Sequence, residues 1–298
     1  MKLRVIEGFV IKAAATCLSI LLIQSVSWAV PGDLDNTFGS NGIVVTDVTG
    51  IVEPDDGRAV ALQPNGKILV AGTSSNEFAV VRYNPDGSPD SSFDGDGIAT
   101  TSIVAGAGAL ANAIALQSDG KIVLAGYADM NPDPIGEEID FALVRYNTDG
   151  SLDTGFDGDG KVTTPIGGAG SDDVITAVAV QPDGKIVAAG TIPTQDFVVA
   201  RYNTDGSLDT SFDIDGIVTT EISGPDYALA IAVQPDGKIL VAGQSYTPLG
   251  GPLGFAVARY EVDGSLDTTF SGTAASLLNC RDSQTLRPTP WRYCPMAR

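Results

Sequence analysis

Short apolar segments alternate with clusters of Gly, Asp, Asn and Pro along most of the chain. At the start of this pattern, the apolar segments are Gly42–Thr46, Arg58–Gln63, Lys67–Gly72 and Phe78–Tyr83. Val, Ile and Ala are frequent in them, which favours strands, and the clusters between them favour turns. Outside residues 1–29, no segment shows a helical period. The pattern therefore predicts an all-β chain built from many short strands.

Three sequence markers recur in a fixed order, so the strands are grouped in repeats. The first marker, Gln-x-x-Gly-Lys, is a hairpin-turn signal that occurs at Gln63–Lys67, Gln117–Lys121, Gln181–Lys185 and Gln234–Lys238. The second is an Arg-Tyr pair, which begins at Arg82, Arg145, Arg201 and Arg259. The third is Leu-Asp-x-x-Phe, which begins at Leu34, Leu152, Leu208 and Leu266, with Pro89 in place of Leu in one further copy.

Each repeat of about 55 residues contains four predicted strands, which is typical of a β-propeller blade. The first strands are assigned to Ile43–Thr46, Ile98–Thr101, Val162–Thr164 and Ile217–Thr220, and each is followed by three more. The sequence therefore predicts a propeller with four blades of four antiparallel strands in residues 30–272. The alternative is that these blades form part of a larger propeller. A β-sandwich would not explain repeated four-strand units, and a β-solenoid would normally repeat at a shorter interval.

Successive loops of an up-and-down meander alternate between the two ends of the strands. The Gln-x-x-Gly-Lys turns and the Asp-Gly-Ser-x-Asp loops are therefore expected to share one end, where the sequence is nearly constant. The loops at the other end vary: Gly72 to Phe78 is six positions, and Gly126 to Phe141 is fifteen. Loop variation on a constant scaffold favours a binding surface at that end, with neutral variation as the alternative.

The third repeat, from Gln181 to Phe212, carries the most complete pattern. It reads Gln-Pro-Asp-Gly-Lys-Ile, then Phe-Val-x-x-Arg-Tyr-Asn-x-Asp-Gly-Ser-Leu-Asp-x-x-Phe. This pattern resembles the delta-60 repeat, a bacterial β-propeller-like repeat found largely in exported proteins, with Val198 in place of the usual alanine. The resemblance covers residues 34–270 and implies propeller architecture and export. It implies no defined reaction.

The repeated aromatic and basic residues have structural explanations. The equivalent phenylalanines are expected to fill gaps between blades; they are Phe38, Phe93, Phe156, Phe212 and Phe270. The arginines of the four Arg-Tyr pairs are expected to bind repeat aspartates or strand-end carbonyls. A basic ligand site is the alternative for these arginines.

Paired aspartates follow three of these phenylalanines and form candidate calcium sites. The pairs are Asp94 with Asp96, Asp157 with Asp159, and Asp213 with Asp215. Carboxylates one residue apart beside glycine can place oxygens around Ca²⁺, and an exported protein meets millimolar calcium. No copy reads as Asp-x-Asp-x-Asp-Gly with a glutamate at the twelfth position. The alternative is a polar turn that leads into a strand.

The net charge and the absence of histidine disfavour or exclude several kinds of partner and reaction. The chain has 37 acidic and 17 basic residues, a formal charge of −20, and no histidine. This charge disfavours nucleic acid and anionic membrane surfaces as partners. Without histidine, Ser-His and Cys-His nucleophile pairs and His-ligated metals are excluded. Paired carboxylates would still suffice for glycoside cleavage, so an extracellular carboxylate-based hydrolase remains the enzymatic alternative.

The two ends of the chain depart from the repeat. Residues 1–29 combine a basic start with an apolar stretch from Ala13 to Ile23 and a small-x-small pattern at 27–29, which predicts a cleaved signal peptide; a membrane anchor is the alternative. Residues 273–298 form a basic, non-repeat tail that contains Cys280 and Cys294, which could form a disulfide in an oxidising compartment. Together these features predict a secreted, periplasmic or cell-surface binding or scaffold module. Its ligand, a protein or a glycan, is not identified by the sequence.

Overall fold

The computed structural model of the chain describes residues 33–50, 54–131, 138–168, 172–192, 196–246, 253–270 and 275–278. The predicted signal peptide, Cys280 and Cys294 lie outside these residues. The chain divides into two compact units, Met1–Val44 and Val45–Arg298. In the first unit, residues 33–44 form turns and an isolated bridge between Gly39 and Ile43. Every strand of the described residues lies in the second unit.

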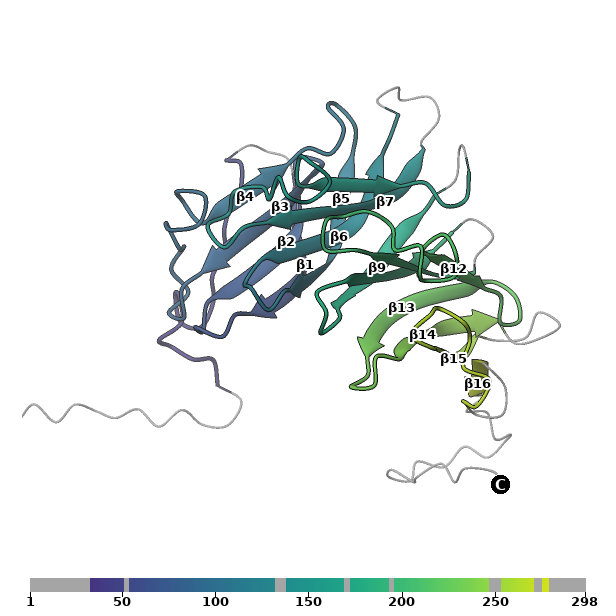
Figure 1. Ribbon diagram of the computed structural model, residues 1–298. Helices are drawn as coiled ribbons and strands as arrows, with labels where there is room; N and C mark the ends of the chain where they lie inside the picture. Colours follow the sequence, from purple (N-terminus) through teal and green to yellow (C-terminus); the bar gives the residue numbers. More distant parts are fainter. Residues whose placement is uncertain are drawn as a thin grey trace, which may run out of the picture. The chain divides into compact units, whose positions relative to one another are not determined.

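The strands of the second unit form four sheets, shown in Figure 1. Sheet 1 contains β1 (Asp55–Leu62), β2 (Ile68–Ser74), β3 (Glu77–Tyr83) and β4 (Ile98–Thr101). Sheet 2 contains β5 (Ala109–Leu116), β6 (Ile122–Asp129), β7 (Ile139–Tyr146) and β8 (Lys161–Thr164). Sheet 3 contains β9 (Val174–Val180), β10 (Ile186–Thr191), β11 (Phe197–Tyr202) and β12 (Ile217–Thr220). Sheet 4 contains β13 (Asp226–Val233), β14 (Ile239–Tyr246), β15 (Leu253–Tyr260) and β16 (Ala275–Leu278).

Within each sheet, every strand pairs antiparallel with the strand that follows it in the sequence. This is the up-and-down meander of a propeller blade. The prediction of an all-β, four-bladed propeller with four antiparallel strands per blade is confirmed. Among the described residues, no helix is long and apolar enough to cross a membrane.

The grouping of strands into blades differs from the prediction. The segments predicted as first strands are the fourth strands of the preceding sheets; for example, Ile98–Thr101 pairs with β3. Residues 44–46, predicted as part of the first strand of the first blade, form no strand. The repeat is cyclic in sequence, so its pattern does not show which neighbour the short strand joins. β16 pairs with β15 in the register of the other fourth strands, so sheet 4 extends into the segment predicted as a tail.

The four sheets follow one another in series, and each packs face to face on the next. Three apolar clusters fill the spaces between consecutive sheets. Each cluster contains a phenylalanine of the repeated motif with none of its surface exposed: Phe93 between sheets 1 and 2, Phe156 between sheets 2 and 3, and Phe212 between sheets 3 and 4. The prediction that these aromatic residues fill gaps between blades is confirmed for these three. Phe38 and Phe270 are half-buried.

A buried ion-pair cluster recurs at one end of each sheet and involves all three sequence markers. In sheet 3, Asp209 accepts hydrogen bonds from Arg201 Nε at 2.6 Å and from Lys185 Nζ at 2.7 Å. The Arg201 guanidinium lies 4.5 Å from the centre of the Phe212 ring, which adds a cation–π contact. The equivalent carboxylates of the other sheets are Asp90, Asp153 and Asp267. Because Lys185 comes from the turn and Asp209 from the long loop, these two loops share one end of the sheet, as predicted.

The same arginines join neighbouring sheets. Arg82, Arg145 and Arg201 donate to the backbone carbonyls of Thr148, Thr204 and Val262 in the next sheet, at 2.5, 2.6 and 2.6 Å. Each buried guanidinium thus donates both to the carboxylate of its own repeat and to a backbone carbonyl of the next sheet. The prediction that the arginines bind repeat aspartates or strand-end carbonyls is confirmed for the aspartates in all four repeats. The carbonyls that these three arginines reach lie in the turns after the third strands.

Asp140 in β7 is a buried carboxylate with acidic neighbours at the variable-loop end. Burial, together with the nearby charges of Asp173 and Glu138, raises its pKa from 3.8 to about 6. Because the folded pKa lies above the unfolded one, folding favours the protonated form. The stabilising effect of this proton is fully present below about pH 4 and is lost as the pH rises through about 6.

Replacing Asp140 with Asn, which imitates the protonated acid, should therefore stabilise the fold at pH 7 by about 1–3 kcal/mol. The advantage over the unmodified chain should disappear near pH 4. Thermal melts between pH 4 and 8 measure this difference. The same change at the exposed Asp159 gives the baseline for an aspartate outside the buried cluster. An advantage for Asp140→Asn that does not change with pH would contradict this assignment.

Candidate functional site

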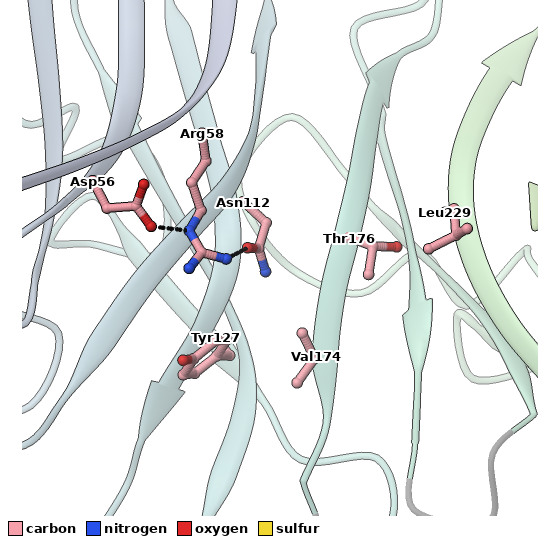
Figure 2. A pocket seen from close by; sticks show the side chains of 7 residues that line it. All are labelled: Asp56, Arg58, Asn112, Tyr127, Val174, Thr176 and Leu229. Atoms are coloured by element: carbon pink, nitrogen blue, oxygen red, sulfur yellow. Dashed lines mark hydrogen bonds and ion pairs between the residues drawn. The ribbon is translucent and has the colours of Figure 1, made fainter.

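A shallow pocket of about 660 Å³, wide open to solvent, lies along the first strands of the four sheets. These strands follow one another in contact, β1 with β5, β5 with β9, and β9 with β13. Figure 2 shows the side chains that line the pocket. They are Asp56, Arg58, Asn112, Tyr127, Val174, Thr176 and Leu229. All four sheets therefore contribute to one site.

Four of the lining residues occupy the same position of the repeat. Arg58, Asn112, Thr176 and Leu229 each lie five residues before the Gln of the turn marker. At this position each first strand has a β-bulge, so the residue has no partner on the second strand. A bulge leaves one residue outside the regular ladder and changes the direction of its side chain. In this propeller unit, the bulges place four unlike side chains at one pocket.

A glycine on the second strand makes each bulge possible. The four glycines are Gly72, Gly126, Gly190 and Gly243. A Cβ atom at Gly126 would overlap the backbone carbonyl oxygen of Leu110 and would lie 2.9 Å from the Cα of Ala111. The other three meet the equivalent carbonyls of Asp56, Val174 and Tyr227. The glycine of each Ala-Gly dipeptide therefore leaves room for the bulged backbone beside the pocket. The side chain of the bulge residue differs from repeat to repeat.

Hydrogen bonds fix the polar side of the pocket, as the dashed lines in Figure 2 show for Arg58. Arg58 Nε donates to Asp56 Oδ2 at 2.8 Å, and an Arg58 Nη donates to Asn112 Oδ1 at 3.2 Å. Asn112 Nδ2 in turn donates to the carbonyl of Ile175 in sheet 3 at 2.8 Å. The side chains of Arg58 and Asp56 are 42% and 51% exposed, so both remain accessible to a ligand.

The other side of the pocket is less polar. Thr176 Oγ1 donates to the carbonyl of Ala228 in sheet 4 at 2.7 Å. Its hydroxyl proton is therefore used within the protein and is not available to a ligand. Val174 lies on β9, and Leu229 on β13 is 55% exposed. In Figure 2, Leu229 lies beyond Thr176, on the side of the pocket away from Arg58. The site therefore combines a charged and amide-bearing side with an apolar side.

Sequence reasoning did not identify this pocket. The sequence predicted a binding surface at the end of the strands where the loops vary in length. Parts of these loops, at 132–137, 193–195 and 247–252, lie outside the described residues. A signal for the bulge residues was nevertheless present. In each repeat, an alanine that does not vary directly follows a position that changes from Arg58 to Asn112, Thr176 and Leu229. Variation in chemical type next to this constant alanine indicates a side chain that the core does not constrain.

The candidate calcium aspartates lie in three equivalent turns. The first aspartate of each pair has a positive φ, and its backbone N–H donates to a carbonyl of the next sheet; these residues are Asp94, Asp157 and Asp213. The second accepts a hydrogen bond from the N–H two residues later, at 2.9 Å in each case; these residues are Asp96, Asp159 and Asp215. Such bonds stabilise a turn that leads into the fourth strand.

Each of these turns carries two carboxylates close together. Burial, then the charges of Asp96 and Asp149, raise the pKa of Asp94. In the part of the chain that the structure describes, no group of three or more His, Cys, Asp or Glu side chains is placed to hold a metal ion. The contacts assign the six aspartates a role in the turns. A calcium role stays a prediction.

Comparison with known families agrees with the repeat found in the sequence. The family model described as "Domain of unknown function (DUF5122) beta-propeller" matches at residues 63–93, 117–156, 181–212 and 234–270. Each match runs from the Gln of the turn marker to the phenylalanine of the third marker. The chain is a β-propeller repeat protein. No curated protein matches the sequence of this propeller.

Several solved structures are similar to part of the chain at low identity and low TM-score. A protein of unknown function from Bacteroides caccae is 13% identical, with a TM-score of 0.42, over 70% of this chain and 57% of that one. A putative gluconolactonase is 12% identical, with a TM-score of 0.37, over 74% and 63%. An endo-arabinase from Bacteroides thetaiotaomicron is 9% identical, with a TM-score of 0.40, over 72% and 78%. The chain thus spans less than two thirds of the first two.

Proposed function

We propose that this propeller is an exported binding module and that its ligand occupies the pocket between the first strands. The observation that carries this proposal is the set of bulge residues. A repeated scaffold places Arg58, Asn112, Thr176 and Leu229 at equivalent positions, yet each has a different chemistry. A merely structural position would be expected to repeat, as the Ala-Gly dipeptide does. Resemblance to the delta-60 repeat supports export, to the periplasm, the cell surface or the medium.

The lining of the pocket suits a hydroxyl-rich ligand such as the end of a glycan. Asp56 offers an acceptor, Arg58 offers donors in a planar fork, and Asn112 offers both. Tyr127, Val174 and Leu229 provide apolar surface for the C–H groups of a sugar ring. Pockets with a few placed polar groups on an otherwise apolar wall are typical small-molecule sites. We therefore favour a glycan over a protein as the ligand.

The hydrolase alternative is less well supported by the same residues. Carboxylate-based glycoside cleavage uses two carboxyl groups, one as acid and one as base or nucleophile. Of the seven residues that line the pocket, only Asp56 carries a carboxylate. Its Oδ2 already accepts a hydrogen bond from Arg58. These contacts support binding without cleavage.

The proposal is tested by exposing the purified chain to an array of neutral and acidic oligosaccharides and measuring the strongest binders by calorimetry. We expect Arg58→Ala and Asn112→Ala each to weaken binding about tenfold or more, because each removes hydrogen bonds that orient the ligand. Thr210→Ala, an exposed change away from the pocket, is the matched control and should bind normally. Thermal melts show whether the variants remain folded.

Two results would overturn the binding proposal. One is an absence of oligosaccharide binding at about millimolar concentration, the weak end of specific affinity. The other is equal binding by the pocket variants and the control. Release of reducing sugar by the chain, lost in Asp56→Asn, would establish the hydrolase instead.

A further inference from the structure

The series of sheets has two ends, and each end has an uncovered face. We name the face that packs on the next sheet the leading face, and the face that packs on the previous sheet the trailing face. Sheets 1 and 2, 2 and 3, and 3 and 4 each join a leading face to a trailing face. Among the described residues, no strands of sheets 4 and 1 make comparable contact. The leading face of sheet 4 and the trailing face of sheet 1 therefore lack a partner sheet.

The leading face of sheet 4 exposes residues that are buried in every other sheet. Phe255 is 68% exposed, whereas its equivalents Phe78, Phe141 and Phe197 have no exposed surface. The Arg259 side chain is 22% exposed, against 4–6% for Arg82, Arg145 and Arg201. Those three arginines each bind a carbonyl of the following sheet, and Arg259 has no such acceptor among the described residues. This face therefore has the residues that pack between sheets elsewhere, but no sheet packs against it.

The trailing face of sheet 1 likewise exposes apolar residues whose equivalents in the other sheets are packed. Val60 and Leu62 in β1 are each 70% exposed, whereas the equivalents Ile114 and Leu116 in sheet 2 pack in the first apolar cluster. The carbonyl of Pro85 lies at the repeat position where Thr148, Thr204 and Val262 accept an arginine hydrogen bond. The outer part of this face is covered, since Tyr83 is buried and its hydroxyl donates to Thr46. The open area lies on the inner strands β1 and β2.

We propose that these two faces bind each other between two copies of the chain, with sheet 4 of one copy packed on sheet 1 of the other. On the inner strands, the interface continues one that the chain already makes three times. At the outer position, where Thr101, Thr164 and Thr220 bond the tyrosine of the next sheet, Thr46 already bonds Tyr83, so the new contact is confined to the inner strands. Phe255 would take the place of Phe197, Val60 that of Ile231, and Arg259 would donate to the carbonyl of Pro85. The contact is head-to-tail, so two copies could form two identical interfaces that cover the inner strands of both end sheets.

The test uses one acidic substitution on each face of the purified chain. Phe255→Glu blocks the leading face of sheet 4, and Val60→Glu blocks the trailing face of sheet 1. Ile214→Glu makes the same kind of change at a loop residue that is 88% exposed and belongs to neither face. Sedimentation over a range of concentrations in about 150 mM salt, where long-range repulsion between acidic chains is screened, gives the assembly mass. All three sites are exposed, so circular dichroism should show the native β signal in each variant.

The expected masses are specific to head-to-tail contact. The unmodified chain and Ile214→Glu should have twice the mass of one chain, and Phe255→Glu and Val60→Glu should each have the mass of one. An equal mixture of the two should recover the twofold mass, because the intact leading face of one variant meets the intact trailing face of the other. Larger assemblies that dissociate in both single variants would also support head-to-tail contact.

Three results would overturn this inference. The first is an unmodified chain that stays monomeric at about 100 μM, well above the dissociation constant of a specific interface. The second is a dimer that survives in either single variant, because a symmetric contact between like faces needs only one of them. The third is a mixture of the two variants that remains monomeric.

Discussion

Replacing Asp209 with alanine is expected to lower the free energy of unfolding by about 3–5 kcal/mol, since it leaves a buried cation without its partner. Asp209 is 4% exposed and Arg201 is 3% exposed. The carboxylate accepts hydrogen bonds from Arg201, Lys185 and the Ser211 hydroxyl. Without it, the Arg201 guanidinium remains buried between sheets 3 and 4 with a net charge. Chemical denaturation measures the loss.

Asp205→Ala is the matched control for this change. Asp205 is an exposed aspartate of the same loop, and its carboxylate bonds only to Ser207 among the described residues. We expect a loss below about 1 kcal/mol for this variant, as is usual at exposed positions. Equal losses for the two variants would show that the buried ion-pair cluster contributes no more than an ordinary turn.

The pH dependence of this cluster has the opposite sign to that of Asp140. Burial alone would raise the pKa of Asp209, but the hydrogen bonds from Lys185 and Ser211, with the charge of Arg201, hold it well below its usual range. A folded pKa below the unfolded value stabilises the fold above about pH 4, and this contribution is lost as the pH falls toward the folded value. Asp90 and Asp267 are shifted in the same direction. The propeller should therefore lose stability in acid at several repeats together.

Replacing Gly126 with alanine is expected to destabilise the fold by about 3 kcal/mol or more, at the upper end of overpacking costs. The added methyl group would overlap the carbonyl oxygen of Leu110, and its other near neighbours are also backbone atoms that cannot rotate away. Relief requires loss of the bulge in β5, which would turn the Asn112 side chain out of its present position. The same variant should therefore lose both stability and pocket binding.

Gly108→Ala provides the control for the loss of glycine itself. Gly108 precedes β5, and a Cβ atom there would meet nothing within 4 Å. Its φ lies outside the left-handed region, so alanine should be neutral or stabilise by up to about 1 kcal/mol through the unfolded chain. Both variants lose a glycine, but only Gly126→Ala introduces steric overlap. The difference between their free energies of unfolding, measured by chemical denaturation, therefore gives the cost of the overlap. A Gly126→Ala variant as stable as Gly108→Ala would show that the bulges do not depend on glycine.

The inferred contact between copies and the proposed pocket depend on different parts of the same repeat. The pocket uses the bulge positions of the first strands, whereas the uncovered faces use side chains that point between sheets. Phe255→Glu and Val60→Glu should therefore leave the bulge frame intact, and Arg58→Ala should leave the end faces intact. Binding and assembly can be measured separately for this reason.

Much of this architecture follows from the sequence because it is local and repeated. Alternating apolar segments and turn residues identify the strands, and recurrence of Gln-x-x-Gly-Lys, Arg-Tyr and Leu-Asp-x-x-Phe shows that they form equivalent sheets. Even the pairing of Arg201 with a repeat aspartate and the burial of Phe212 could be predicted, because a residue that recurs at every repeat must satisfy the same environment each time. These predictions required only local patterns and their recurrence along the chain.

Tertiary structure alone decided three further features. It placed the short strands Ile98–Thr101 and its equivalents at the end of each sheet, because a cyclic pattern has no intrinsic starting point. It brought Arg58, Asn112 and Leu229 to one pocket, although more than 50 residues separate successive repeats along the chain. It also buried Phe197 and exposed Phe255, two residues with the same motif, because only one of them has a sheet on its far side. Local sequence sets what each sheet can contact, and the number and order of packed sheets determine which of those contacts form.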